Sequence, residues 1–363
     1  MKKISKMIFI ALILAFSTMF LSACDLDEDE INYLIENSGE IAEFFPFLHD
    51  TLFAYQGDQD TRLNQIAFAG FIEGNMMQRI VHQGAVSTTE VFVHEGGELR
   101  LTFANPVVYD FINVMDEPAN LDLVILREPL VVGNSWSMTG MDTTEIVSMD
   151  TEVITPAGTF EAMRVVTTYV TGDQMISYFA RDVGLVRQVV VWDGEESAYS
   201  LFSIVERTQM EMTLPIHWVD GVTFELNSTP VALRFSTNDD VLSVLADALR
   251  TAGDNFGPLL TPNTAINKIT IDAQTGSQAA TVHFDISSDF IEELDLSREE
   301  EDLKLQMLAN TVGNFFVVQR FVITVDGEAY SSENVNIAPG DFIVVERIEF
   351  DYGFGAESII NAN

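Results

Sequence analysis

Cysteine is almost absent from this chain, because Cys24 is the only one among 363 residues. A single thiol cannot form a disulfide within the chain, so no disulfide framework stabilises the fold. Histidine is scarce as well: there are five, and none stands in a His-Glu-x-x-His zinc motif. The sequence therefore predicts no metal site and no cofactor.

Basic residues are also few. Lys and Arg total 18 against 56 Asp and Glu, which gives a formal net charge of −38 at pH 7. So large a negative charge argues against nucleic acid and anionic lipid headgroups as ligands, because both would be repelled. It fits a cationic partner, or solubility in a salty exterior. The scattering of the acids over loops favours the second.

Long apolar runs are also rare, and the clearest lies at the N-terminus. Lys2, Lys3 and Lys6 precede an apolar stretch from Met7 to Phe20. A short positive region followed by an apolar run of this length is typical of an export signal and not of a stable membrane span. The sequence therefore predicts that the mature protein lies outside the cytoplasm.

The residues that follow are Leu21, Ser22, Ala23 and Cys24. They resemble the lipobox of bacterial lipoproteins, Leu-x-small-Cys. The resemblance implies that residues 1–23 are a signal peptide and that Cys24 carries diacylglycerol, which would anchor the protein to the extracytoplasmic face of the cell membrane. Removing the signal peptide removes three lysines and takes the net charge from −38 to −41. The alternative is a plain secretory signal.

An acidic segment, residues 24–43, comes next and has two interpretations. Asp25, Asp27, Asp29 and Glu36 fall at positions 1, 3, 5 and 12 of an EF-hand-like calcium loop. However, Glu30 occupies the sixth position, where such a loop needs glycine for its sharp turn. We therefore interpret the segment as a solvated tether.

Residues 44–210 alternate apolar and polar residues in short runs that contain many β-branched residues. Examples are Leu99–Phe103, Met163–Tyr169 and Leu185–Val191, and turn signals such as Glu95-Gly96-Gly97-Glu98 and Asp193-Gly194 separate the runs. Many short strands without a convincing long helix predict a curved antiparallel sheet, a half-barrel, because the sheet must curl to cover its apolar face.

Three phrases in this region carry a family resemblance. They are Leu130–Trp136 (LVVGNSW), Thr155–Phe160 (TPAGTF) and Tyr178–Val186 (YFARDVGLV). In this order they resemble a family of uncharacterised β-rich bacterial lipoproteins. The resemblance implies a fold and no activity.

Residues 211–336 show a different pattern, with residues 337–363 as a C-terminal extension. A helix is expected from Asp240 to Leu249, ending before Gly253, and a second is expected behind Ser297, whose hydroxyl would cap it. Strands surround both helices. The pattern predicts an α+β sandwich with two helices on one face of a small sheet.

Four phrases in this second half carry another resemblance: Gly257–Thr264 (GPLLTPNT), Ala280–Asp285 (ATVHFD), Leu305–Val312 (LQMLANTV) and Phe321–Gly327 (FVITVDG). They resemble the GerM domain, also called GerMN, of spore-forming bacteria. The resemblance implies a non-enzymatic envelope lipoprotein that takes part in building envelope assemblies during sporulation, with a fold akin to ring-building domains.

No catalytic pattern emerges from the remaining residues. Ser135 lacks the trailing glycine of a nucleophile elbow, and acids are so numerous that no single pair indicates acid–base catalysis. Asp285 is predicted to cap the turn at Ser287, and His283 to be structural. We therefore predict that the protein is not an enzyme.

Aromatic residues of the second half suggest an interface. Those that we expect at a docking edge are Trp218, Phe224, Phe235, Phe315 and Phe316, although core packing is the simpler explanation for them. Two functions remain open. The protein is either an interaction module that binds an envelope protein or a second copy of itself, or a protein that holds an apolar ligand, such as a lipid or wall precursor, in the curved sheet.

Overall fold

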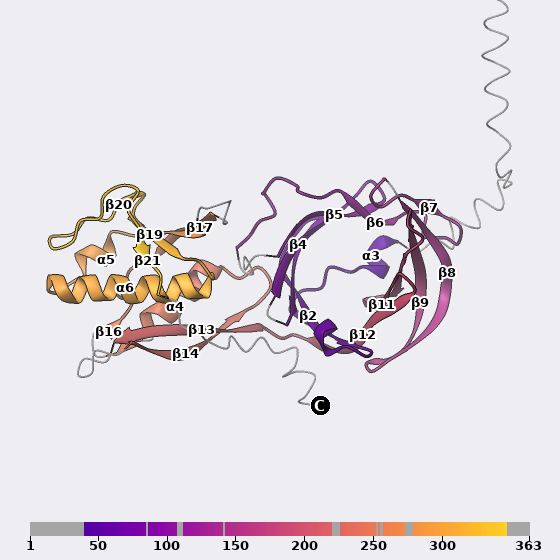
Figure 1. The fold of residues 1–363 in the computed structure, drawn as a ribbon, viewed down its shortest axis with the longest axis horizontal. Coiled ribbons are helices and arrows are strands. Elements are labelled where there is room, and N and C mark those ends of the chain that lie inside the picture. The colour runs from indigo at the N-terminus through magenta and orange to yellow at the C-terminus, as the bar shows by residue number, and fades with distance from the viewer. Residues whose placement is uncertain are drawn as a thin grey trace, which may run out of the picture.

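The computed structural model describes residues 40–84, 86–106, 112–140, 142–219, 226–251, 253–254, 257–272 and 279–346. The predicted signal peptide, the lipobox with Cys24, most of the tether and Phe224 lie outside these residues. Within them, no helix is both long and apolar enough to cross a membrane. The described chain forms two domains that follow each other along the molecule (Figure 1).

The first domain is one antiparallel sheet of twelve strands in the order β6-β5-β4-β3-β2-β1-β12-β11-β10-β9-β8-β7. The strands are β1 (Thr51–Gly57), β2 (Gln65–Glu73), β3 (Met76–Gln83), β4 (Val86–Glu95), β5 (Glu98–Asn105), β6 (Leu123–Arg127), β7 (Ser135–Trp136), β8 (Asp142–Thr155), β9 (Gly158–Tyr169), β10 (Gln174–Ala180), β11 (Gly184–Trp192) and β12 (Glu195–Glu206), and a 3₁₀ helix η1 (Thr61–Leu63) joins β1 to β2. The predicted curved antiparallel sheet is therefore present. It curls further than the expected half-barrel and is nearly closed (Figure 1).

Two of the predicted turns are confirmed. Gly96 and Gly97 connect β4 to β5 with φ values of 62° and 74°. Asp193 and Gly194 connect β11 to β12 with φ values of 50° and 81°. Two successive positive φ values give the turn whose twist matches that of a hairpin, and glycine and aspartate tolerate this conformation better than most residues do.

The two faces of the sheet have different neighbours, because successive side chains on a strand point to opposite sides. On one face Leu52, Phe68 and Ile80 are paired across β1, β2 and β3, and they belong to the same buried cluster as residues of the second domain. On the other face Met77 and Leu99 belong to a cluster that includes the N-terminal residues of the described chain. Figure 1 shows helix α3 (Ile41–Phe44) inside the curl of the sheet.

The second domain combines a hairpin, two main helices and a five-stranded sheet. Its elements are β13 (Met210–Val219), β14 (Leu226–Phe235), α4 (Val241–Thr251), β15 (Gly253–Asp254), β16 (Gly257–Pro258), β17 (Ile266–Asp272), β18 (Thr281–Ile286), α5 (Asp289–Glu292), α6 (Arg298–Phe315), β19 (Arg320–Val325), β20 (Glu328–Ala329) and β21 (Ile343–Val344). The sheet runs β17-β18-β19-β20, and β21 also pairs with β19.

The layering differs from the predicted two-layer sandwich. Helix α6 contacts both β13 and β19, and α4 contacts both β14 and β17, so the helices lie between the hairpin and the sheet. Residues Met307 to Phe315 of α6 are all buried, which a helix on the surface of a sheet would not show. The hairpin is an additional layer that the order of elements along the chain did not reveal.

The beginning of α6 follows the sequence-based prediction. The hydroxyl of Ser297 accepts a hydrogen bond from the backbone N–H of Glu300, whose carboxylate accepts one from the N–H of Ser297 at 2.8 Å. This capping box satisfies N–H groups that have no partner within the helix. Three glutamates in the first turn complement the positive end of the helix dipole.

A short segment between β14 and α4 fastens the second domain to the first. Thr237 donates its N–H to the Asp50 carboxylate at 2.8 Å, and the Asp50 N–H donates to the Thr237 hydroxyl at 2.9 Å. The Asn238 side chain accepts from the N–H of Ile72 at 2.7 Å and donates to its carbonyl at 3.0 Å. The Asn238 N–H donates to the carbonyl of Gly70, where β2 bulges. We call Asp50, Thr237 and Asn238 the interdomain latch.

Candidate functional site

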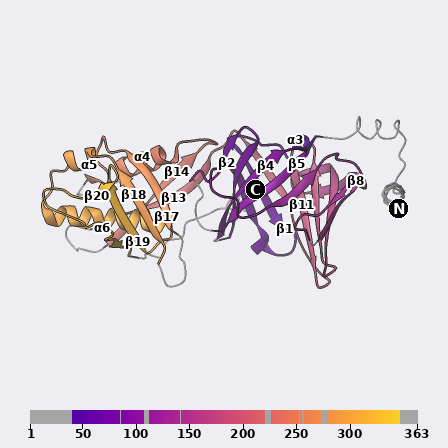
Figure 2. The same ribbon diagram turned by 90° about the horizontal axis from the view of Figure 1, so that it is seen from above.

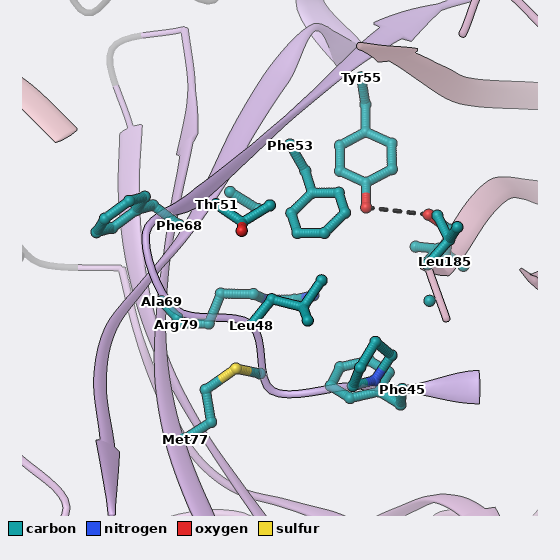
Figure 3. Close-up of a pocket in the computed structure, with 14 residues that line it drawn as sticks. Phe45, Leu48, Thr51, Phe53, Tyr55, Phe68, Ala69, Met77, Arg79 and Leu185 are labelled. Carbon is teal, nitrogen blue, oxygen red and sulfur yellow. Dashed lines mark hydrogen bonds between the residues drawn. The ribbon is translucent and has the colours of Figure 1, made fainter. Parts of the chain in front are cut away.

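A cavity of about 40 Å³ lies on the inner side of the curled sheet (Figure 3). Its lining includes Phe45 and Leu48 from the N-terminal segment, Tyr55 from β1, and Met77 and Arg79 from β3. A buried water needs roughly 10–15 Å³, whereas small-molecule pockets measure about 300–1,000 Å³. With the N-terminal segment in place, the cavity therefore has room for a few waters and not for an organic ligand.

Arg79 brings a charge into this mostly apolar lining. Its Nε and Nη2 both donate to Oε2 of Glu90, at 2.9 and 2.7 Å. Its guanidinium carbon lies 4.7 Å from the ring centroid of Phe92 and 5.7 Å from that of Phe45. Burial lowers the pKa of Arg79, but the Glu90 carboxylate raises it, and the net shift is upward. The side chain is thus a permanent cation whose charge Glu90 neutralises.

Two tyrosines form the polar part of the same interior. Tyr55 donates its hydroxyl to the carbonyl of Leu185 at 3.0 Å, and Tyr199 donates to the side-chain oxygen of Gln188 at 2.8 Å. Their rings meet edge to face with centroids 5.6 Å apart. Burial raises the pKa of Tyr55 well above its ordinary value and that of Tyr199 to about 12. Both phenols are therefore neutral hydrogen-bond donors at physiological pH.

Sequence reasoning did not single out Arg79 or Tyr55. A usable signal was nonetheless present in β3, where Met77, Arg79 and Val81 occupy alternate positions on the same face. A charge at an apolar position of an alternating strand points to an internal partner. The partner itself, Glu90 on β4, could not be identified without the register of the two strands.

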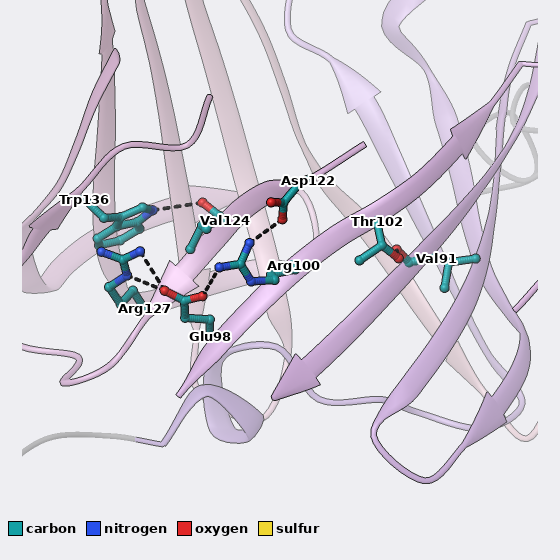
Figure 4. Close-up of polar contacts among 8 residues, drawn as sticks. All are labelled: Val91, Glu98, Arg100, Thr102, Asp122, Val124, Arg127 and Trp136. Carbon is teal, nitrogen blue, oxygen red and sulfur yellow. Dashed lines mark hydrogen bonds and ion pairs between the residues drawn. The ribbon is translucent and has the colours of Figure 1, made fainter. Parts of the chain in front are cut away.

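The seam between the edge strands β6 and β7 is bridged by side chains (Figure 4). Trp136 donates its indole N–H to the carbonyl of Val124 at 2.8 Å. Beside it, Glu98 forms ion pairs with Arg127, at 2.6 Å, and with Arg100. The Trp136 bond joins β7 to β6 and so replaces part of the missing backbone ladder, whereas the Glu98 ion pairs lie within β5 and β6. The motif around Trp136 is therefore structural.

The outer face of the five-stranded sheet is a second candidate surface. Figure 2 shows β17, β18 and β19 side by side in front of α6. At the β21 edge, Val344 is 61% exposed and Phe342 is 41% exposed, while the guanidinium of Arg320 lies 4.3 Å from the Phe342 ring centroid. We call Arg320, Phe342 and Val344 the β21 patch. Its apolar groups and its cation are typical of an interface.

The aromatic residues proposed from the sequence for an interface require correction. Phe235, Phe315 and Phe316 are only 2–4% exposed and belong to the core of the second domain, so they offer no surface to a partner. Trp218 is half-buried and donates its indole N–H to Thr229 at 3.0 Å. Phe235 is part of the hairpin itself, and Phe315 and Phe316 lie at the end of α6, which contacts both the hairpin and the sheet, so all three rings pack into the core between these layers.

Asp285 has a different role from the one predicted. Its carboxylate accepts hydrogen bonds from the Thr324 hydroxyl at 2.6 Å and from the Gly327 N–H at 2.8 Å. It thus caps the turn between β19 and β20 and not the turn at Ser287. Strand β18 pairs in parallel with β19, which brings these distant residues together.

His283 lies on the outer face of the same sheet. Its Nε2 is 2.9 Å from the Asp272 carboxylate, and its side chain is 43% exposed. No group of three or more His, Cys, Asp or Glu side chains within the described residues is arranged to hold a metal ion.

Comparison with protein families gives one match. The model of the Germane family, described as sporulation and spore germination, matches residues 215–331. The match agrees with the GerM resemblance predicted for residues 211–336, and it spans the region from β13 to the end of β20. No curated protein matches the chain.

Some solved structures share limited likeness with the chain. A Bacteroides fragilis protein provisionally described as exported, with a YmcC-like fold, is 14% identical over 45% of this chain and 99% of its own, with a TM-score of 0.29. A Parabacteroides distasonis protein provisionally described as a lipoprotein is 15% identical over 45% of this chain and 98% of its own, with a TM-score of 0.30. TM-scores this low support no inference about fold or function.

Proposed function

We propose that this chain is a lipid-anchored, non-enzymatic protein of the extracytoplasmic cell envelope, and that its second domain binds an envelope protein during sporulation or germination. The observation that carries the proposal is the Germane match over residues 215–331, which coincides with a structurally distinct domain. The open sheet face and the β21 patch supply a surface for such a partner.

The interaction is tested by crosslinking in intact cells with wild type and a Val344→Asp variant. A carboxylate in the centre of an apolar contact must lose its hydration, so we expect at least about a tenfold loss of the crosslinked product. Val170→Asp is the matched control, since Val170 is 82% exposed at the end of β9 in the first domain. Equal products from all three proteins would contradict the assignment of the β21 patch.

The anchor is tested separately by fractionation of cells that express Cys24→Ala. Without a thiol there is no diacylglycerol, and two acyl chains are what holds such a protein on the membrane. We expect the variant in the soluble or uncleaved fraction and the wild type with the membrane. A processed Cys24→Ala protein that remains on the membrane would contradict lipidation.

A second candidate function is the binding of an apolar ligand on the inner face of the first domain. The observation that favours it is the cavity beside Arg79, because the packing of the interior is incomplete where Phe45 meets β1, β2 and β3. Thermal shift with envelope lipids, compared with lipid-free buffer, tests this candidate. No shift with any lipid would reject it.

A further inference from the structure

The N-terminal segment packs against the inner face of the first domain. Ile41, Phe44 and Phe45 are 0%, 3% and 8% exposed, and they share one cluster with apolar residues of the sheet such as Phe92 and Leu99. These apolar side chains therefore fill an apolar part of the inner face of the sheet. We call residues 41–48 the plug.

The polar bonds that hold the plug are few, and they involve Ile41 and Glu43 at its beginning. The N–H of Asp182 donates to the carbonyl of Glu43 at 2.6 Å, and the N–H of Ile41 donates to the Glu128 carboxylate at 3.2 Å. Arg181 also forms an ion pair with Glu43, and both side chains are about half exposed. Because exposed ion pairs contribute about 0–1 kcal/mol, the plug is held chiefly by its apolar contacts.

The fit between the plug and the sheet is incomplete. The 40 Å³ cavity lies between Phe45 and Leu48 of the plug and the wall formed by β1, β2 and β3. Ala67 and Ala69 face this cavity from β2, and their small side chains leave the wall recessed. A void in an apolar contact weakens it, because the lining atoms lose their dispersion partners.

In the wall behind the plug, Arg79 can donate hydrogen bonds, and its pairing with Glu90 leaves the two side chains with no net charge. Two of the five N–H groups of Arg79 donate to Glu90, and the other three have no hydrogen-bond partner among the described residues. Since Glu90 cancels the charge of Arg79, a carboxylate or phosphate would meet a neutral pair inside a strongly acidic protein. A carbonyl oxygen would accept from the remaining N–H groups at no such cost.

We propose that the inner groove of the first domain binds the acyl chain of a neutral ester lipid, that the ester carbonyl accepts from Arg79, and that the plug is an internal competitor that the lipid displaces. This inference rests on the second candidate function. It adds the class of ligand, the residue that recognises the head of the ligand, and the segment that controls access.

The test compares two probes that carry the same fluorophore, a long-chain monoacylglycerol and the corresponding fatty acid. The protein begins at residue 24 and carries Cys24→Ala, so that no anchor competes. We expect the monoacylglycerol to bind at least about tenfold more tightly than the fatty acid. In Phe45→Ala the affinity for the monoacylglycerol should rise by about tenfold or more, since the competing closed state is weakened.

A variant that changes the charge beside Arg79 tests whether this residue recognises the head of the ligand. Glu90→Gln leaves the charge of Arg79 uncompensated, so the preference should reverse in favour of the fatty acid. Glu98→Gln is the matched control, because it also removes an ion-paired glutamate from the sheet, but at the seam and away from the cavity. In a further arm of the experiment, vesicles of phosphatidylcholine replace the monoacylglycerol. Binding of the protein to these vesicles would identify membrane phospholipid as the source of the acyl chain.

Displacement of the plug is measured by hydrogen exchange. The amide N–H groups of Phe45 and Asp182, which donate to Ile41 and Glu43, should exchange faster when the monoacylglycerol is bound. Binding without faster exchange, or binding that Glu90→Gln leaves unchanged in preference, would overturn the inference and leave the second candidate function intact. No binding of either probe by folded Phe45→Ala would overturn both.

Discussion

At the scale of single residues, two buried histidines, His82 and His217, should make the stability of the fold sensitive to acid. His82 is 2% exposed in β3, and His217 is fully buried in β13, where the hydroxyl of Thr311 in α6 accepts a hydrogen bond from the backbone N–H of His217 at 2.9 Å. Burial lowers the pKa of each imidazole to about 4 from an ordinary value of 6.5. Each is therefore neutral in the folded protein at pH 7.

The sign of the pH dependence follows from this shift. Below pH 6.5 the unfolded chain takes up protons on these imidazoles and the folded chain does not, so stability falls as the pH falls toward 4. Between pH 7 and 5 we expect a loss of about 2 kcal/mol for His217. Urea unfolding at pH 7 and pH 5 should show a smaller loss of the free energy of unfolding in His217→Gln than in wild type. The same change at half-exposed His283 controls for the substitution, and an equal loss in all three proteins would contradict the prediction.

At the scale of elements, three amide side chains of α6 hold the backbone of the final described segment, which includes β21. Gln306 and Asn314, two turns apart, donate to the carbonyls of Val344 and Glu346, both at 2.9 Å, and Asn310 accepts from the Glu346 N–H at 2.9 Å. These amides follow the i, i+4 spacing of a helix face and bind the backbone of the final described segment. They fix β21 and hence the β21 patch.

Gly313 permits this contact. A Cβ atom at this position would lie 2.3 Å from Cγ2 of buried Val345, which is closer than atoms can approach. We expect Gly313→Ala to lower the free energy of unfolding by about 1–3 kcal/mol, as overpacking does.

A double-mutant cycle with Val345→Ala checks the cause. In the Val345→Ala background, Gly313→Ala should cost clearly less, because the methyl groups that it meets are gone. The measurement is urea unfolding of the four proteins. Equal costs of Gly313→Ala in both backgrounds would show that the close approach to Val345 is not the reason for glycine here.

At the scale of the whole molecule, the interdomain latch joins the two domains into one unit. Asn238 has a φ of 69°, a left-handed conformation that asparagine tolerates, and this turns its side chain onto the backbone of Ile72. Each of its hydrogen bonds contributes about 1 kcal/mol. The shared apolar cluster around Phe68 and Phe235 adds to them.

Loss of the latch should loosen the pair of domains and leave each domain folded. We expect Asn238→Ala combined with Asp50→Ala to increase the radius of gyration in small-angle X-ray scattering and to split thermal unfolding into two transitions. Asn75→Ala is the control, since Asn75 donates to the carbonyl of His94 within the first domain. An unchanged scattering profile would mean that the apolar contact alone fixes the domains.

Local chemistry by itself determined much of this protein. Alternation predicted the antiparallel sheet, Ser297 predicted the start of α6, and paired turn residues predicted the hairpins, because these features depend on neighbours within a few residues. The phrases of the second half predicted the family to which residues 215–331 are similar.

Only the tertiary structure decided what depends on residues far apart in the chain. The register of β3 and β4 places Glu90 against Arg79, and the parallel pairing of β18 and β19 gives Asp285 its turn. The packing of the hairpin, the helices and the sheet into one core buries Phe235 and Phe315. Which face of a strand or helix is covered is a property of packing, and the same amphipathic pattern serves an open surface and an internal layer equally well.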